Sequence, residues 1–225
     1  MRSRTLSCLI AILTLASCTL LSACGLLGGG PSAPDIPPEA PDVVSLDPQN
    51  WYIFYSAQMP SHPETDGEGA WSFEFPSSGT GGHVNYVQTP FNATTTLHNV
   101  TVTFKVESVE PQYVVIDPTD IPPATVHIFF EQQNSSLSDA NGRWWAGPSQ
   151  YNLGSKDNTI VSFSVPLTPD QWSNVYGQRD SKSFYAALAN VGWIGVTFGG
   201  QYFWGHGVAL ASGSAKYILI GFQVN

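Results

Sequence analysis

The residues best suited to ligand chemistry are aromatic side chains gathered in two short segments. The 225-residue chain has seven Trp and nine Tyr, more than we expect one core to need. An indole stacks on a sugar ring while its N–H reaches hydroxyls. The first segment, Asn141 to Gly147, contains Arg143, Trp144 and Trp145. Adjacent strand residues point to opposite faces, so one Trp is expected to be exposed, with Tyr151 nearby; burial of both is the alternative.

The second segment runs from Gly199 to Gly207 and carries Trp204 and His206. Its glycines let the backbone bend tightly, so its polar and aromatic tip is a candidate for binding a ligand. His206, which lies between two glycines, is equally suited to be a hydrogen-bonding strut that fixes the loop.

A third candidate is one strand face with His127, Phe129 and Glu131, which continues to Gln133 and Asn134. If that face is open, it offers an aromatic platform beside hydrogen-bonding groups. If a loop or helix covers it, the same residues form a second layer of core.

Catalysis has less support in the sequence. Sugar hydrolysis usually uses two carboxylates, and Glu74 and Glu131 are the best pair, with Glu107 a less suitable partner. Neither the Gly-x-Ser-x-Gly motif of serine hydrolases nor the His-Glu-x-x-His motif of zinc proteases occurs. We expect no cofactor, although a structural calcium ion is an alternative, because Asp66, Glu68, Asp117 and Asp120 lie in predicted loops.

Strands must position these residues, because hydrophobic and polar residues alternate along most of the chain. The alternating ranges are Trp71–Phe75, Asn99–Val109, Val126–Glu131, Ile160–Leu167 and Ile194–Phe198. Two further ranges, Trp51–Ala57 and Lys216–Val224, are apolar on both faces, as in strands covered on each side. Thr168–Gln171 and Asp180 are predicted to begin short helices. The pattern predicts an all-β fold, a two-sheet antiparallel sandwich over residues 43–225.

The layout from Asn99 to Asn225 resembles bacterial β-jelly-roll domains of the carbohydrate-binding-module type. The segments that carry this resemblance are Val100–Val106, Val126–Glu131, Arg143–Trp145, Val165–Leu167 and Trp172. It implies a jelly roll of eight or more strands, with the first and last strands close together, and a glycan as ligand.

The N-terminus has its own signature. Arg2 and Arg4 precede an apolar stretch that ends in Leu21-Ser22-Ala23-Cys24, and this order is typical of a secretory signal. The last four residues resemble the lipobox of bacterial lipoproteins. The resemblance implies removal of residues 1–23, acylation of Cys24 and a membrane anchor outside the cytoplasm. Since residue 25 is Gly rather than Asp, it implies the outer membrane in a host with two membranes.

The composition of the chain indicates a linker, the absence of disulfides and an acidic charge that disfavours some classes of partner. Residues 24–42 read as a linker rich in Gly and Pro. Cys8 and Cys18 fall in the predicted signal, so no disulfide is expected in the mature chain. That chain would carry six basic and 17 acidic side chains, which argues against nucleic acid.

These features favour a tethered, non-catalytic glycan-binding lipoprotein of the cell envelope. One alternative is a structural lipoprotein that binds another envelope protein, which predicts a contiguous apolar patch. The second alternative is a glycosidase or polysaccharide lyase.

Overall fold

A computed structural model describes residues 42–225 apart from 68, 93–96, 137, 148–150 and 156–157. The predictions for the signal 1–23, for Cys24 and for nearly all of the linker therefore lie outside the described residues. None of the helices in the described ranges has the length and apolarity needed to span a bilayer.

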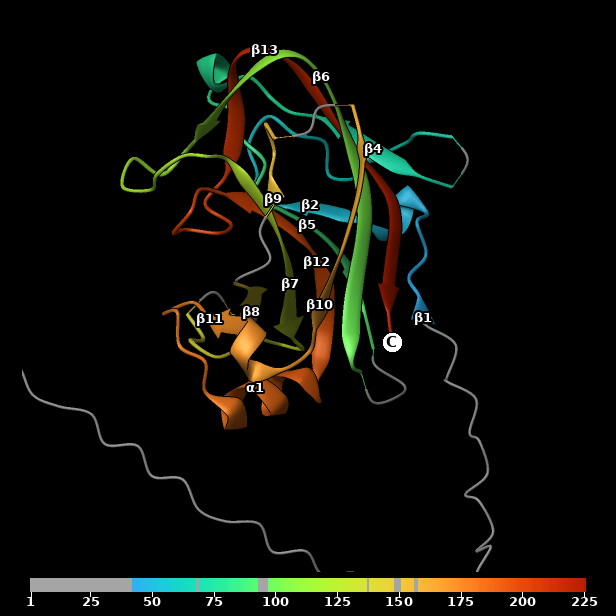
Figure 1. Ribbon diagram of the computed structural model, residues 1–225, viewed down its shortest axis with the longest axis vertical. Helices are drawn as coiled ribbons and strands as arrows, with labels where there is room; N and C mark the ends of the chain where they lie inside the picture. The colour runs from blue at the N-terminus through green and yellow to red at the C-terminus, as the bar shows by residue number, and fades with distance from the viewer. Residues whose placement is uncertain (1–41, 68, 93–96, 137, 148–150, 156–157) are drawn as a thin grey trace, which may run out of the picture. The chain divides into compact units, whose positions relative to one another are not determined.

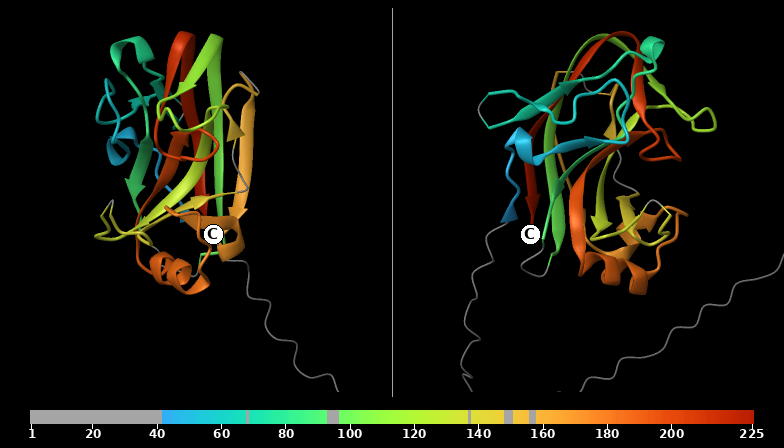
Figure 2. Two further views of the ribbon diagram at one scale, coloured as in Figure 1. Left: turned by 90° about the vertical axis from the view of Figure 1, so that its left-hand side faces the viewer. Right: turned by 180° about the vertical axis from the view of Figure 1, so that it is seen from behind.

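Two antiparallel sheets make up the described chain (Figures 1 and 2). Their strands are β1 (Asp42–Val43), β2 (Tyr52–Phe54), β3 (Glu64–Thr65), β4 (Trp71–Glu74), β5 (Tyr86–Pro90), β6 (Asn99–Val115), β7 (Thr125–Gln132), β8 (Arg143–Ala146), β9 (Tyr151–Asn152), β10 (Ile160–Pro166), β11 (Trp172–Asn174), β12 (Val191–Gly199) and β13 (Val208–Val224). The six-stranded sheet has the order β10-β6-β13-β4-β3, with β1 beside β13. The seven-stranded sheet has the order β11-β8-β7-β12-β5-β2, with β9 beside β7.

The strand order is that of a jelly roll. The eight strands of four or more residues lie as β10-β6-β13-β4 in one sheet and β8-β7-β12-β5 in the other, so that the chain repeatedly crosses between the sheets. The first described strand pairs with the last, with Asp42 opposite Val224. The predicted all-β, two-sheet antiparallel sandwich is confirmed, and so is the closeness of its first and last strands.

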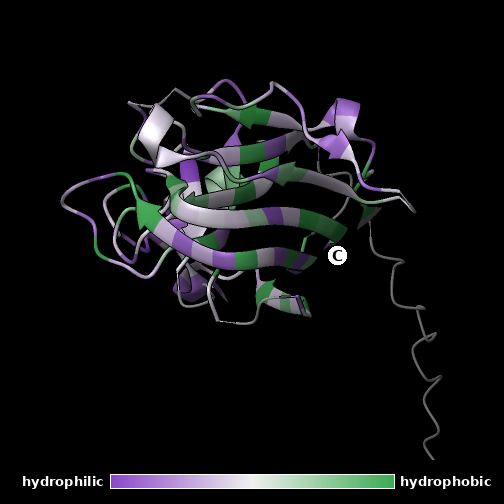
Figure 3. Cartoon of the chain, turned by 90° about the horizontal axis from the view of Figure 1, so that it is seen from above, coloured by the Kyte–Doolittle hydropathy of each residue, from purple (hydrophilic) through white to green (hydrophobic). Residues whose placement is uncertain are grey.

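The core lies between the sheets and follows from the alternation of residues along the strands. On β6, Val100, Val102 and Phe104 are fully buried, and the intervening Thr residues face outward. Figure 3 shows this pattern as alternating bands along the strands.

Four of the seven Trp side chains are fully buried in this core: Trp51, Trp71, Trp144 and Trp172. A buried aromatic side chain removes roughly 150–250 Å² from water, which makes these rings a large part of the packing. The other three Trp side chains, Trp145, Trp193 and Trp204, lie outside this main core.

The helical predictions are met in part. Thr168 is followed by a single 3₁₀ turn, Pro169–Gln171, because Trp172 must be extended to pair with β8. The helix α1 (Ser181–Leu188) begins as predicted at Asp180, whose carboxylate accepts a hydrogen bond from Ser183 N at 2.7 Å.

Another difference concerns the range Trp51–Ala57, which was predicted to be a strand covered on both faces. Only Tyr52–Phe54 forms a strand, and it lies at the edge of the seven-stranded sheet. Its outer face is only partly covered: the Tyr52 ring packs against His62 and Trp193, whereas Phe54 is exposed.

Candidate binding site

A cavity of about 720 Å³ opens on the outer face of the seven-stranded sheet, which is the face turned away from the core. Its floor side chains belong to β5, β8 and β11 and are Tyr86, Arg143, Trp145 and Ser173. Its walls come from the segments 116–118 and 201–206 and from Asn174, Val175 and Gly177, and Tyr55 closes a further side. Small-molecule sites typically enclose roughly 300–1,000 Å³, so the cavity has the size of a ligand site.

An ion pair lies at the floor. Arg143 on β8 is the cross-strand neighbour of Glu131 on β7. Its Nη2 and Nε donate to Glu131 Oε2 at 2.6 and 3.0 Å, and both residues are buried. The guanidinium carbon is 4.9 Å from the ring centroid of Tyr86 and 5.8 Å from that of Tyr55, which places it in cation–π range of both rings. The pair thus brings a hydrogen-bonding group to the cavity with its charge neutralised.

A small aromatic cluster supports the floor, separately from the main core. Tyr86, Phe129 and Trp145 are buried together, with ring centroids of Tyr86 and Phe129 5.0 Å apart. Trp204 packs against them from the loop between β12 and β13. The loop approaches closely because residue 205 is Gly: a Cβ there would lie 2.2 Å from Tyr86 Oη.

His127 lies beneath Trp204 as part of this packing. The two rings stack with centroids 4.6 Å apart. Nδ1 donates to the carbonyl oxygen of Ala146 at 2.9 Å, and Nε2 is 3.2 Å from Thr125 Oγ1. The side chain is fully buried, and burial lowers the pKa of His127 to about 4, so the ring is neutral at physiological pH.

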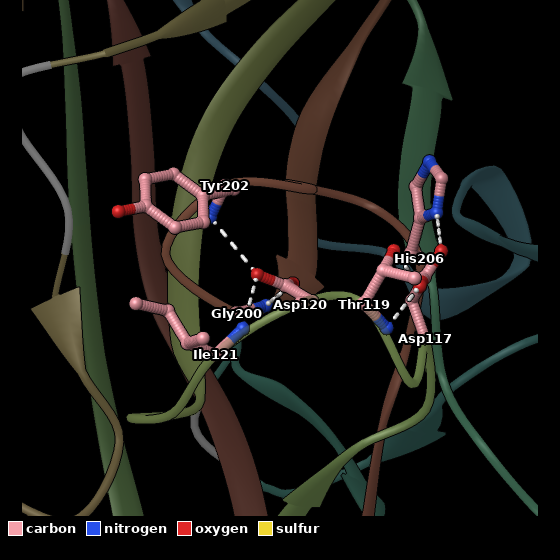
Figure 4. Close-up of polar contacts among 7 residues, drawn as sticks. All are labelled: Asp117, Thr119, Asp120, Ile121, Gly200, Tyr202 and His206. Carbon is pink, nitrogen blue, oxygen red and sulfur yellow. Dashed lines mark hydrogen bonds and ion pairs between the residues drawn. The ribbon is translucent and has the colours of Figure 1, made fainter.

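Two aspartates fix the loops that wall the cavity (Figure 4). Asp120 is buried, and its carboxylate accepts hydrogen bonds from Gly200 N at 2.7 Å and Tyr202 N at 3.0 Å. It therefore joins the segment after β6 to the segment after β12, across 80 residues of sequence.

The second aspartate, Asp117, lies on the cavity wall beside His206, which donates from Nδ1 at 2.8 Å. Hydrogen bonds from the Thr119 hydroxyl and backbone N–H, followed by the contact with His206, lower the pKa of Asp117 to about 2. His206 thus makes a hydrogen bond that joins its loop to Asp117, as in the strut alternative, and its exposed ring also lines the cavity.

Three polar atoms at the cavity are buried and have no hydrogen-bond partner among the described residues. They are Trp145 Nε1, Ser173 Oγ and Asn85 Oδ1. Ser173 and Trp145 are direct cross-strand neighbours on β11 and β8. Buried polar groups are normally hydrogen-bonded, so a cluster of unpaired ones beside a cavity favours an external partner such as a ligand or water.

The rim of the cavity exposes aromatic rings. Tyr202 is 67% exposed, Tyr55 49% and Phe203 38%, while Trp204 is half-buried. Large apolar rings at the mouth of a polar-floored cavity are positioned to stack on a ligand.

Some residues predicted for the site are placed elsewhere. Trp144 is fully buried in the core, and its indole N–H donates to the backbone oxygen of Asn141 at 2.8 Å. Tyr151 packs against Phe104, also a core residue, at 5.0 Å between centroids. Asn141 itself accepts a hydrogen bond from Asn174 Nδ2 through Oδ1. None of these three residues lines the cavity. Trp144 faces the core because the sheet period turns it inward and its neighbour Trp145 outward.

The remaining predicted residues do come together on the outer face. Arg143, Trp145, Trp204 and His206 line the cavity. His127, Phe129 and Glu131 share this face but are buried under other side chains. Of the two alternatives given for this face, they form the second layer of core rather than an open platform.

The candidate carboxylate pair of the catalytic alternative is not formed. Glu74 on β4 and Glu107 on β6 belong to the six-stranded sheet, whereas Glu131 belongs to the other sheet, so the core separates them. A sequence pattern identifies outward-facing residues but not the sheet to which they belong.

The acids considered for calcium have other partners. Asp66 forms an ion pair with Lys216, and Asp117 and Asp120 accept the hydrogen bonds described above; Glu68 lies outside the described residues. Across the described ranges, no group of three or more His, Cys, Asp or Glu side chains is placed to hold a metal ion.

Sequence reasoning missed Tyr55, Tyr86 and Ser173 as cavity residues. Tyr55 could have been found from its position beside Tyr52 and Phe54, but the whole range Trp51–Ala57 was predicted to be a strand covered on both faces. Tyr86 and Ser173 lie in strands that carry no distinctive local pattern.

No protein-family model matches this chain, and no curated protein matches it either. Among solved structures, a xylan-binding module is 11% identical over 80% of this chain and 97% of its own, with a TM-score of 0.43. A family 11 carbohydrate-binding module from Clostridium thermocellum, in complex with a β-1,3-1,4-mixed-linked tetrasaccharide, is 13% identical over 81% and 93%, with a TM-score of 0.36. A Bacteroides thetaiotaomicron protein provisionally described as a glycoside hydrolase is 11% identical over 72% and 54%, with a TM-score of 0.36. At these values the likeness is one of β-sandwich architecture and assigns no ligand to this chain.

Proposed function

We propose that the β-sandwich binds an uncharged, hydroxyl-rich glycan in the cavity on its seven-stranded sheet and does not cleave it. The observation that carries this proposal is the pairing of exposed rings at the rim with buried hydrogen-bonding groups at the floor. Tyr202 and Tyr55 would stack on the apolar faces of sugar rings. Arg143, Trp145 Nε1 and Ser173 would hydrogen-bond to hydroxyls.

The charges at the cavity favour a neutral ligand. Arg143 is paired with Glu131, and Asp117 is engaged by His206, so the floor and wall present no cation free to attract an acidic sugar. The chain as a whole is acidic, with a formal net charge of −9. An anionic glycan would meet a repulsive field, and the described residues that line the cavity include no exposed Arg or Lys of the kind that usually recognises carboxylate.

The same groups favour binding over hydrolysis. Glycosidases usually need a pair of carboxyl groups, one of them protonated so that it can act as general acid. Asp117 is the one Asp or Glu among the described residues that line the cavity. With a pKa of about 2 it stays ionised, and its oxygens are held by Thr119 and His206.

The N-terminal motif adds a tether to this proposal. Acylation of Cys24 would hold many copies on one membrane of the cell envelope, where weak single-site binding gains strength through multivalency. Expression with a labelled palmitate analogue is expected to label the wild type and not Cys24→Ser, and the variant is expected to leave the membrane fraction. Equal labelling of both would contradict the tether and leave the cavity untouched.

Affinity electrophoresis in gels containing xylan, mannan, mixed-linkage β-glucan or dextran tests binding directly. We expect retardation by at least one polysaccharide and a loss of about fivefold in affinity for Tyr202→Ala, since an aromatic contact contributes roughly 1 kcal/mol. Tyr185→Ala is the matched control, because Tyr185 is similarly exposed but lies on α1, away from the cavity. Unchanged mobility of the wild type on every polysaccharide would refute the proposal.

A further inference from the structure

A row of aromatic side chains leads away from the cavity across the outer face of the same sheet. We define the aromatic strip as Tyr52, Phe54, Tyr55 and Trp193. Ring centroids are 5.8 Å apart for Tyr52 and Trp193, 6.3 Å for Phe54 and Trp193, and 5.6 Å for Phe54 and Tyr55. Although Trp193 is about 140 residues from the other three in sequence, the fold joins them into one surface.

The strip is continuous with the cavity. Tyr55 belongs to both, since it lines the cavity and its ring lies 5.9 Å from that of Tyr86 on the floor. The guanidinium of Arg143 lies 5.8 Å from the same ring. A ligand that leaves the cavity past Tyr55 therefore meets Phe54 next and then Trp193.

The strand period places the strip on the outer face. Ile53, between Tyr52 and Phe54, packs into the core, and so does Ile194 beside Trp193. Phe54 is 38% and Tyr55 49% exposed, while Tyr52 and Trp193 are half-buried. Each ring therefore keeps part of its surface available to a partner.

Gly195 leaves the outer face of β12 without a side chain next to Trp193. It follows Trp193 on the outer side of β12, and its close approach to β5 excludes a side chain, because a Cβ would lie 2.1 Å from Val87 O. The consequence is that no side chain projects from position 195 between Trp193 and the cavity.

We propose that the bound ligand is the interior of a polysaccharide chain that lies across the sheet, with some sugars in the cavity and others on the aromatic strip. This inference rests on the proposed function. From β11 to β2 there are five interstrand spacings, which is about 24 Å at the usual strand separation, so the combined surface is far longer than one sugar ring. None of the four strip residues is an Asp, Glu, Lys, Arg or His, in keeping with the neutral ligand inferred from the cavity.

The test is the length dependence of binding by the full chain. Calorimetry with oligosaccharide ladders cut from xylan, mannan and mixed-linkage β-glucan, from disaccharide to hexasaccharide, measures the affinity at each length. We expect the wild type to bind the hexasaccharide of at least one ladder much more tightly than the disaccharide. Trp193→Ala and Phe54→Ala should each reduce the ratio of hexasaccharide to disaccharide affinity by about three- to tenfold, as loss of one aromatic contact predicts. Tyr185→Ala should leave the ratio unchanged.

The outcomes separate the two proposals. Equal affinities for disaccharide and hexasaccharide, with no effect of either strip variant, would overturn the polymer inference and leave glycan binding in the cavity standing. No binding of any ladder or polysaccharide would overturn the proposed function and the inference with it. Phe54→Ala keeps the test open if Trp193→Ala unfolds, because Phe54 is at the sheet edge and more exposed.

Discussion

The burial of His127 predicts a specific loss of stability in mild acid. Its pKa is about 4 in the folded protein, against 6.5 for the free side chain. Above pH 6.5 the ring is neutral in both states, so it has no effect on the pH dependence. As pH falls from 6.5 through 4, the unfolded chain takes up a proton that the folded protein excludes, and the free energy of unfolding decreases. The loss reaches about 2.5 kcal/mol by pH 4.5, since each pKa unit corresponds to roughly 1.4 kcal/mol.

Urea unfolding followed by Trp fluorescence at pH 7.5, 5.5 and 4.5 measures this loss. The comparison is with His127→Gln, whose amide can still donate to Ala146 O but does not titrate. Asp117 does not interfere, because its pKa is lowered from 3.8 to about 2 and the stability it contributes is lost only as pH falls below about 4. We expect the wild type to lose about 2.5 kcal/mol more than the variant between pH 7.5 and 4.5. Parallel pH profiles for the two proteins would refute the reasoning, since they would mean that the pKa of His127 is the same in the folded and unfolded states.

Three further predictions concern residues around the cavity. Arg143→Leu should lower the free energy of unfolding by about 3–5 kcal/mol because Glu131 stays buried without a partner, and adding Glu131→Leu should recover much of that loss; an additive double-mutant cycle would contradict the ion pair. Asp120→Ala should speed hydrogen exchange at the Gly200 amide at least tenfold, measured by NMR, since that amide loses its acceptor; an unchanged rate would disprove the loop contact. Trp144→Ala should cost about 3–5 kcal/mol in urea unfolding as a core substitution, and a cost below about 1 kcal/mol would contradict its burial.

The fold was predictable because local alternation marks strands directly. The repeat of Val100, Val102, Phe104 and Val106 gave the start and face of β6, and Asp180 gave the start of α1. The strand order was harder to predict from the sequence, because it depends on pairing between distant strands, such as that of Asp42 with Val224. No local pattern encodes such pairing. The resemblance in layout, rather than periodicity, supplied the jelly roll.

The site was predictable only in part. The sequence identified Arg143, Trp145 and Trp204 but not which Trp of the adjacent pair would face the core. Periodicity tells which side chains share a face and does not tell what covers that face. Tyr86 and Trp193 escaped notice because their roles arise from contacts between strands that are distant in sequence.

The burial of Trp51, Trp71, Trp144 and Trp172 has a spectroscopic consequence. These four indoles should emit at short wavelength and resist acrylamide quenching, so ligand should change only a small part of the total fluorescence. Two half-buried indoles, Trp193 on the aromatic strip and Trp204 at the cavity, are the informative emitters. Trp145 also lines the cavity, so replacing it and one of these two indoles by Phe would leave a single local reporter on the bright background. A titration could then follow occupancy of each end of the surface separately.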